Sequence, residues 1–349
     1  ERSVVLLERE EAFGYHATGR SAAEFVLGYN LPDVRGLARI SKDFLDRPPE
    51  GFSEVPLLVP LGCVIIAGEE KRDRFETVMA HEQSLNAGIR RLTREEALEW
   101  APILNPDYVV KAYHDPNFWN IEVESLVQGY LKAARRNGVE VRENNAVGAA
   151  RHENGRWIIS TPSGDISAGV AVNASGGWAD ATAALFGVKP QGIVPHRRTA
   201  ILVDLPAGMD ARTLPEIGEI DDDFYMKPDG GRLFASPADA TPCEPGDVQP
   251  EEIDIAWAAH HVEQATTIAV RRIAKSWAGM RSFAPDKLPV IGLAADNPAF
   301  FWLAGQGGYG ILTSPALGAL AASLLLGNPP PEGLSDVGLD PGRFRPDRF

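Results

Sequence analysis

The sequence has 349 residues, a formal net charge of −14 and 44% hydrophobic residues. That length suits two domains or one elaborate α/β domain, and the composition is ordinary for a globular protein. The acidic excess argues against nucleic acid or an anionic membrane surface as a partner. The two cysteines, Cys63 and Cys243, lie far apart, so neither a disulfide nor a metal site is expected.

The first predicted element is a buried strand over residues 3–7, a short apolar and β-branched run. Glu8 ends this run. An acidic residue that ends the second strand of a dinucleotide-binding βαβ unit binds the ribose hydroxyls, so Glu8 is a candidate cofactor ligand. A surface glutamate after an edge strand is the alternative. The glycine fingerprint G-x-G-x-x-G, expected about twenty residues earlier, is judged absent from the sequence.

A glycine-flanked segment, residues 14–23, follows the first strand. Thr18 or Gly19 is expected to cap a helix that continues to about Tyr29. The small residues 21–23 would allow a flat group to lie against that helix.

The middle of the chain alternates between helical and extended patterns. Apolar spacing predicts helices over residues 34–45, 71–85, 122–136 and 251–267. Extended runs predict strands over residues 61–67, 139–142, 146–151, 157–161, 169–173, 199–203, 224–227, 232–236 and 277–283. The strands between residues 146 and 173 are expected to form a small antiparallel meander.

Two further junctions resemble the first strand end. Residues 170–180 and 299–314 each pass from an apolar run through glycines to a helix, the second of which is expected over Pro315–Leu326. Such turns aim backbone N–H groups at a ligand above them. Ordinary βα turns with spare glycines are the alternative. Junctions near residues 8, 175 and 307, with β-rich blocks between them, predict a dinucleotide cofactor and interleaved segments.

Six motifs resemble the D-amino-acid oxidase/dehydrogenase (DAO) family of FAD enzymes, which includes glycine oxidase and sarcosine oxidase. Within that family the resemblance is closest to bacterial D-arginine dehydrogenase. The motifs are VLLERE at 5–10, GYHATGRSAA at 14–23, VNASG at 172–176, FYMKPD at 224–229, WAGMRSF at 277–283 and QGGYG at 306–310.

The resemblance implies an α/β fold in which a Rossmann-like, GR2-type FAD-binding domain is interleaved with a β-sheet substrate-binding domain. The implied FAD-binding segments are 1–45, 120–185 and 272–349, and the implied substrate-binding segments are 46–119 and 186–271. A parallel sheet joining residues 4–7, 170–173 and 300–304 is expected, with non-covalent FAD extended between Glu8 and residues 307–313.

The resemblance also implies oxidative deamination of a D-amino acid. Hydride would pass from the substrate Cα to flavin N5, giving an imino acid that hydrolyses to a 2-oxo acid and ammonia. Oxygen or a membrane quinone would accept the electrons. The expected location is the cytoplasm, with any membrane contact arising through the acceptor at the inner face. A sarcosine-type oxidase of secondary amines and a flavin-binding protein without turnover are the alternatives.

The resemblance assigns substrate-site roles to five residues. Arg281 would bind the substrate carboxylate with help from Arg198 and Tyr225, the Gly308 carbonyl would accept from the amine, and Tyr29 would lie on a mobile loop over the site. A bidentate guanidinium holds a planar carboxylate in one orientation. A surface position for Arg281 and a core position for Tyr225 are the alternatives. Arg197 is the weaker choice, since neighbouring strand residues face opposite sides.

The implied cofactor contacts come from all three junctions. They are Glu8, Arg9, Thr18, Gly19, Arg20, Ser21, Ala174, Gly176, Trp178, Gly307, Gly308, Tyr309, Gly310, Ile311, Leu312 and Thr313. His16 resembles a family histidine near the flavin, although a loop histidine is more often structural.

Four residues are expected to line the substrate pocket, namely Tyr309 and three that depart from the D-arginine dehydrogenase pattern. Glu24 replaces a histidine, Cys63 replaces a guanidinium-binding glutamate, and Leu312 replaces a glutamine. Because Cys63 cannot pair with a cation, the distal pocket is expected to be less acidic, so that apolar and aromatic D-amino acids compete with D-arginine. Glu24 is the one residue expected to reverse this preference.

Overall fold

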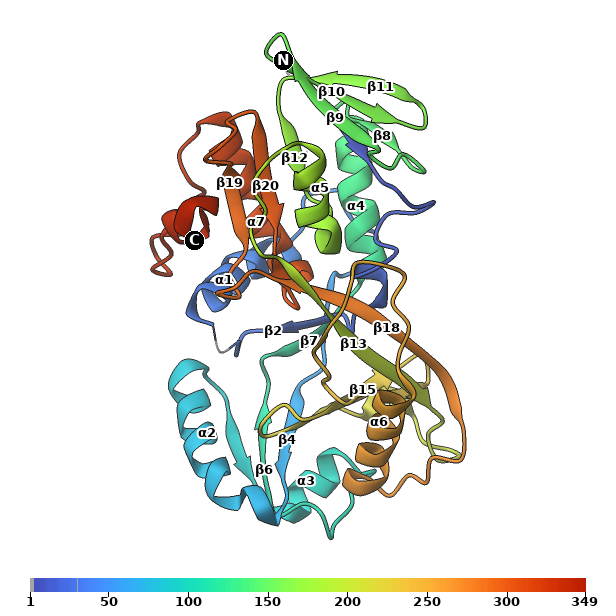
Figure 1. Cartoon of the computed structure of the whole chain (residues 1–349). Coiled ribbons are helices and arrows are strands. Elements are labelled where there is room, and N and C mark those ends of the chain that lie inside the picture. The colour runs from blue at the N-terminus through green and yellow to red at the C-terminus, as the bar shows by residue number, and fades with distance from the viewer. Residues whose placement is uncertain (1–2, 30) are drawn as a thin grey trace.

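The computed structural model describes residues 3–29 and 31–349. Two regions lie along one long axis (Figure 1). The small-sheet region contains several short sheets with helices α4 (Val123–Arg136), α5 (Ala179–Leu185) and α7 (Gly310–Leu326). The large-sheet region contains a ten-stranded sheet with helices α2 (Arg72–Leu85), α3 (Arg94–Trp100) and α6 (Glu252–Ala265).

The large sheet is mostly antiparallel. Its spatial order is β21 (Gln306–Gly307), β18 (Ile273–Phe283), β13 (Val194–Val203), β16 (Arg232–Ser236), β15 (Tyr225–Asp229), β14 (Glu216–Glu219), β4 (Cys63–Ala67), β6 (Lys111–Asp115) and β5 (Arg90–Leu92), with β17 (Thr241–Pro242) paired to β13. The long strands β13 and β18 extend from the middle of the molecule into the large-sheet region (Figure 1). β18 falls in the predicted FAD-binding segment 272–349 although it pairs with this sheet, and the predicted domain boundaries stay a prediction.

The two faces of the large sheet differ in chemistry. Side chains alternate along a strand, and paired residues point to the same side. Val64, Ile201 and Ile217 therefore share one face, where they pack with residues of α3 and α6 in the largest apolar core. The same register places the side chains of five polar residues on the opposite face, which we call the charged face: Arg198, Glu216, Tyr225, Lys227 and Arg281.

The expected single parallel sheet is wrong. β1 (Val5–Leu7) pairs in parallel only with β8 (Glu140–Arg142), whereas β12 (Ala171–Asn173) pairs in parallel with β20 (Phe300–Ala304), which also pairs with β19 (Val290–Leu293). A strand joins a sheet through its edge hydrogen bonds, and no described residue pairs with the second edge of β1 or of β12. Leu6 and Val172 on these strands remain 37% and 47% exposed.

The predicted meander is confirmed for its first two strands, but its third strand lies at residues 164–168 and not at 169–173, because residues 171–173 form β12 and pair with β20. It consists of β9 (Ala149–Glu153), β10 (Arg156–Thr161) and β11 (Gly164–Ala168). Trp157 of β10 is buried and donates to the Ala299 carbonyl at 2.8 Å, which ties the meander to the start of β20.

The helix predicted to continue to Tyr29 is wrong. A single 3₁₀ turn, Thr18–Arg20, is followed by strand β2 (Glu24–Val26), which pairs antiparallel with β7 (Phe118–Ile121), itself paired with β3 (Leu58–Pro60). Ala23 adopts φ 58°, a left-handed conformation that no right-handed helix contains. Phe25 is fully buried in the core beneath β2, so tertiary packing overrides the local helical pattern.

Helix α7 begins five residues earlier than predicted, at Gly310 rather than Pro315. It packs against α1 (Pro32–Asp46) through buried side chains such as Leu37 and Leu317. The remaining short 3₁₀ turns are Glu69–Lys71, Gly176–Trp178, Ala211–Thr213, Pro341–Phe344 and Pro346–Arg348. Among the described residues, none of the helices is both long enough and apolar enough to span a bilayer.

Candidate active site and cofactor cradle

Arg197 and Arg198 are neighbours on β13 but belong to opposite faces of the large sheet. Arg197 donates to Glu251 at 2.5 Å and to Asp254 at 2.9 Å, both at the start of α6. Arg198 pairs with Gly279 of β18, and its side chain lies on the charged face 6.0 Å from the Tyr225 ring centroid. The alternation that favoured Arg198 over Arg197 in the sequence is therefore present in the fold.

Arg281 lies against the glycine turn before α7. A Cβ built on Gly308 would lie 2.4 Å from the Arg281 guanidinium carbon, so a side chain there would displace the guanidinium group. Tyr29 donates its hydroxyl to the Gly308 carbonyl at 3.4 Å, and its ring packs edge-on against Tyr309 at 5.6 Å. The fold thus brings together residues from β18, the turn before α7 and the segment after β2.

Neither arginine of the charged face forms an ion pair within the described part of the chain. Arg198 Nε is buried without a hydrogen-bond partner. Burial, reinforced by the charge of Arg281, lowers the pKa of Arg198. Two guanidinium groups that lack a carboxylate partner favour an anionic ligand, which would satisfy their donors and offset their repulsion.

Three polar residues that the sequence analysis missed lie nearby. Lys227 of β15 donates to the Ala22 carbonyl and, at 2.5 Å, to Asn120 Oδ1 of β7, so it bridges the charged face and the small sheet that carries Glu24. Glu216 of β14 is 3% exposed. Lys227 lies within the FYMKPD motif, but neither it nor the other two was assigned a role, because these residues meet only through pairings between segments distant in sequence.

The four predicted pocket residues have different environments. Glu24 is partly buried, and burial raises the pKa of its carboxyl. Cys63 is fully buried beside Glu216, and burial raises the pKa of its thiol. Leu312 and Tyr309 are both 2% exposed and belong to an apolar core cluster, so Leu312 presents little surface to a ligand.

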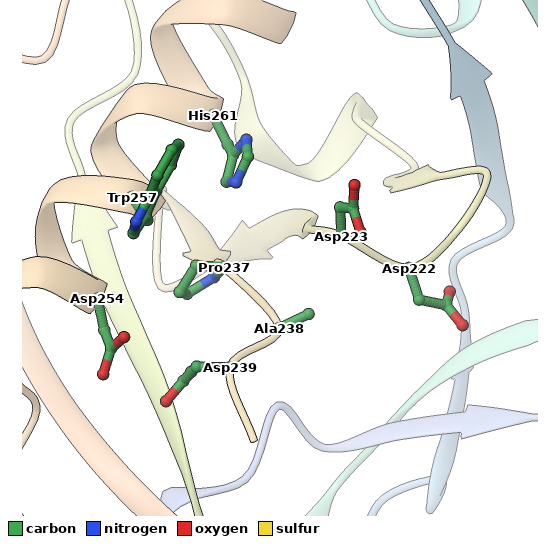
Figure 2. Close-up of a pocket in the computed structure, with 8 residues that line it drawn as sticks. All are labelled: Asp222, Asp223, Pro237, Ala238, Asp239, Asp254, Trp257 and His261. Atoms are coloured by element: carbon green, nitrogen blue, oxygen red, sulfur yellow. The ribbon is translucent and has the colours of Figure 1, made fainter. Parts of the chain in front are cut away.

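A cavity of about 370 Å³ lies at the end of the large sheet near α6. Figure 2 shows Trp257, His261 and Asp254 reaching it from α6, and two loops completing its wall. Asp254 binds Arg197, and Asp239 accepts from the Thr199 backbone at 2.6 Å. These two carboxylates therefore support the fold.

The ends of β1 and β12 meet around Trp178. The Arg9 guanidinium carbon lies 4.5 Å from the Trp178 ring centroid, and the His16 ring lies 4.7 Å from it. Glu8 Oε1 accepts from the Glu10 amide at 3.0 Å. Two of the three junctions are therefore adjacent although β1 and β12 do not pair. Ala174 lies between β12 and the 3₁₀ turn of residues 176–178.

Several predicted cofactor residues have structural partners. Arg20 donates to Asp247 at 2.6 Å and to the Ala278 carbonyl at 3.2 Å, and thereby ties its turn to β18. Thr313 is fully buried and donates to the Tyr309 carbonyl at 2.7 Å. The remaining members of the 18–21 turn bond to one another or to Gly14, as in Ser21 to Thr18 at 2.8 Å and Gly19 to Gly14 at 2.6 Å.

The start of α7 fits a large polar cofactor. Residues 305–310 have the spacing G-x-G-x-x-G after all, in the turn between β20 and α7. Tyr309 caps α7 without a side-chain hydrogen bond, and the first turn contains no acidic residue. Because they belong to the first turn, the N–H groups of Gly310, Ile311 and Leu312 have no acceptor within the helix and suit acceptor atoms of a ligand.

Two further features fit the same cofactor. His16 Nδ1 is buried without a partner among the described residues. Gly176 adopts φ +58°, and no atom lies within 4 Å of a Cβ built there, so the space before this turn is open. Unmet donors and open space at the strand ends suit a dinucleotide whose polar groups approach the backbone.

A family model described as DAO, FAD dependent oxidoreductase, matches residues 1–324. Mitochondrial dimethylglycine dehydrogenase of Rattus norvegicus is 24% identical over 98% of this chain, which spans only 42% of that relative. Glycine oxidase of Geobacillus kaustophilus is 26% identical over 77% of this chain and 70% of its own length.

Solved structures show the same fold. The Geobacillus kaustophilus glycine oxidase structure has a TM-score of 0.84 at 22% identity and covers 99% of this chain and 92% of its own. The L-proline dehydrogenase of P. horikoshii has a TM-score of 0.81 at 19% identity and covers 100% and 98%. The predicted fold class is confirmed, and the resemblance to D-arginine dehydrogenase stays a prediction.

Proposed function

The chain belongs to the DAO family of FAD-dependent oxidoreductases, and from that premise we propose that it oxidatively deaminates a D-amino acid. Amine or amino acid oxidation is the chemistry of the family. Beyond this chemistry, we propose that the substrate is a D-amino acid and that oxygen or a quinone accepts the electrons.

The observation that supports a substrate carboxylate is the unpaired state of Arg198 and Arg281. Burial alone would lower the pKa of Arg281, but nearby acidic groups, Tyr29 first among them, raise it above its ordinary value. Arginine is not deprotonated in proteins at neutral pH, so both side chains stay cationic although burial lowers the pKa of Arg198. A carboxylate bound between them would accept charge-assisted hydrogen bonds, each stabilising by about 1.5–3 kcal/mol.

The Gly308 carbonyl is positioned to orient the amine. From the described residues it accepts one long hydrogen bond, donated by Tyr29, which leaves a lone pair for a substrate N–H. Because Gly308 lies against Arg281, a ligand held by that arginine has its amine beside this carbonyl. Tyr29 would cover the bound substrate and exclude water, with the buried Tyr309 ring packed against it.

FAD would be held by Glu8 at the end of β1, the 176–178 turn and the first N–H groups of α7. When bound, the flavin supplies the hydride acceptor for the substrate Cα–H bond. The chain contributes the carboxylate clamp and the amine acceptor, which together fix the Cα–H bond in one orientation.

Oxidation of N-methylated glycine is the second candidate, because the alignment with dimethylglycine dehydrogenase, at 24% identity, extends over 98% of this chain. A small secondary or tertiary amine would use the same arginine clamp. It would differ in carrying no side chain on Cα.

Anaerobic mixing of the FAD-loaded protein with substrates tests these candidates. We expect D-amino acids to bleach the flavin absorbance, and their L-enantiomers to leave it unchanged. Bleaching by sarcosine or dimethylglycine alone would support the second candidate. If none of these compounds reduces a bound flavin, the chain is a flavin-binding protein without this activity.

A further inference from the structure

Glu216 of β14 is a buried carboxylate on the charged face. Its strand pairs in parallel with β4, and Glu216 lies directly beside Cys63. The side chain is 3% exposed, and Oε2 has no hydrogen-bond partner among the described residues. Cys63 replaces a glutamate of the D-arginine dehydrogenase pattern. Glu216 on the adjacent strand therefore provides a carboxylate beside that position.

Glu24 approaches the same space from the opposite wall. It pairs with Asn120 across β2 and β7, and Asn120 accepts from Lys227 on the charged face. The register Ile217–Met226 and Gly218–Tyr225, continued by one residue, places Lys227 beside Glu216. Both carboxylates thus lie around one ammonium group, each from a different sheet.

Lys227 leaves the two carboxylates incompletely neutralised. Its ammonium group donates to two uncharged acceptors, the Ala22 carbonyl and Asn120 Oδ1, and no ion pair within 4 Å joins it to Glu24 or Glu216 in the described part of the chain. Glu24 Oε1 is also buried without a partner. Burial and the charge of the other carboxylate raise the pKa of Glu216 well above its ordinary value. A second cation would relieve this cost.

The position of Glu216 relative to the arginines suits the far end of a substrate. β13, which carries Arg198, and β14, which carries Glu216, are three strand spacings apart, about 14 Å between backbones, and the register sets Glu216 in line with Leu202, about 13 Å along the strand from Arg198. Tyr225 lies between them on the same face, and the Arg198 side chain reaches toward it. An amino acid with a long side chain can therefore extend from the arginines toward Glu216.

We propose that Glu24 and Glu216 form a cation-binding end of the substrate site, so that the preferred D-amino acid carries a guanidinium or ammonium group at the end of its side chain. This inference rests on the proposed function. It reverses the expectation, drawn from Cys63, that apolar side chains are favoured.

D-arginine and D-citrulline test the inference, because they match in shape and differ in the charge of the terminal group. We expect kcat/KM of the FAD-loaded enzyme to favour D-arginine by about 10-fold or more, the effect of one charge-assisted hydrogen bond. Glu216→Gln should reduce this ratio by about 10-fold with little change for D-citrulline. Asp229→Asn removes one exposed carboxylate from the same sheet and should leave the ratio unchanged.

Two further arms distinguish the outcomes. Glu216→Asp retains the charge and should keep the preference, which separates charge recognition from a folding defect in Glu216→Gln. Calorimetric titration of the FAD-loaded protein with both ligands measures the preference without turnover. D-amino acid oxidation with no Glu216-dependent difference in rate or affinity overturns this inference alone. Selective D-arginine binding without oxidation overturns the proposed function and supports the cation-binding end.

Discussion

Adjacent residues on β13 perform different tasks because a strand exposes them to different surroundings. Arg197 is held by two carboxylates of α6, whereas Arg198 faces the charged side with an unmet donor. The residue type alone therefore does not predict the role of either arginine. The partners that each guanidinium already has decide whether it stabilises the fold or remains available to a ligand.

Arg281→Ala should weaken substrate capture while FAD stays bound. Loss of one charge-assisted carboxylate contact corresponds to about 1.5–3 kcal/mol, or roughly a 10- to 100-fold fall in kcat/KM for the best D-amino acid. Arg198→Ala should act in the same direction. The measurement is steady-state kinetics together with flavin content. Arg281→Lys should recover only part of the loss, since lysine lacks the bidentate fork.

The neighbouring variant Arg197→Ala provides the contrast. It removes the ion pairs to Glu251 and Asp254, so it should lower Tm and leave KM nearly unchanged. An Arg281→Ala enzyme with unchanged kcat/KM would place Arg281 outside the substrate site.

Glu216 should make stability depend on pH in a predictable direction. Its folded-state pKa is raised above the ordinary value of 4.5, so the folded state holds the proton more tightly than the unfolded state. The free energy of unfolding is therefore highest at low pH for this group, and falls as pH rises from 4.5 through the folded-state pKa. A pKa raised by one corresponds to about 1.4 kcal/mol.

Thermal unfolding of wild type and Glu216→Gln across pH 5 to about 8 measures this effect. We expect the variant to gain Tm relative to wild type as pH rises, because the amide never acquires a buried charge. Parallel pH profiles of Tm for the two proteins would show that ionisation of Glu216 does not destabilise the fold.

At the scale of elements, sequence patterns were reliable where the local sequence alone determines a strand or a helix. The strand over residues 300–304 and the helix ending at Arg136 are found where predicted. Glu216 was missed because its role depends on β14 pairing with β4, about 150 positions earlier in the chain. The short segment Glu216–Glu219 has no strong alternation, so only tertiary pairing identifies it as a strand.

Two mid-helix glycines should respond in opposite ways to the same substitution. Gly129 of α4 is covered by Phe52, whose ring carbon lies 2.4 Å from a built Cβ, whereas Gly318 of α7 has no atom within 4 Å. Gly129→Ala should cost about 1–3 kcal/mol through overpacking, more than the helical gain of alanine. Gly318→Ala should stabilise by about 0.5–1 kcal/mol.

Urea unfolding of both variants measures the difference. The helical preference for alanine is common to the two positions, so the gap between them reports the packing of Phe52 on α4. Equal stabilisation by both substitutions would mean that Phe52 moves aside without cost.

For the whole molecule, interleaving makes the two regions interdependent. β13 and β18 connect the glycine turn before α7 with the charged face, so cofactor position and substrate position share one support (Figure 1). The three junctions and the family resemblance predict which segments hold the cofactor, and this assignment stays a prediction. The failure of β1 and β12 to pair was not inferable, because edge pairing depends on neighbours that no local pattern specifies.

The net charge of −14 should govern which artificial electron acceptors work well. An anionic acceptor such as ferricyanide is repelled by the acidic surface, whereas a neutral short-chain quinone is not. Raising ionic strength from about 0.01 M to about 1 M shortens the Debye length from about 30 Å to about 3 Å, so it screens this repulsion. We expect the rate of flavin reoxidation by ferricyanide to rise roughly 10-fold or more over that range, and the quinone rate to stay nearly constant.

Stopped-flow reoxidation of substrate-reduced protein measures both rates at fixed pH. A ferricyanide rate that falls with added salt would instead reveal a cationic surface near the flavin, strong enough to outweigh the overall charge.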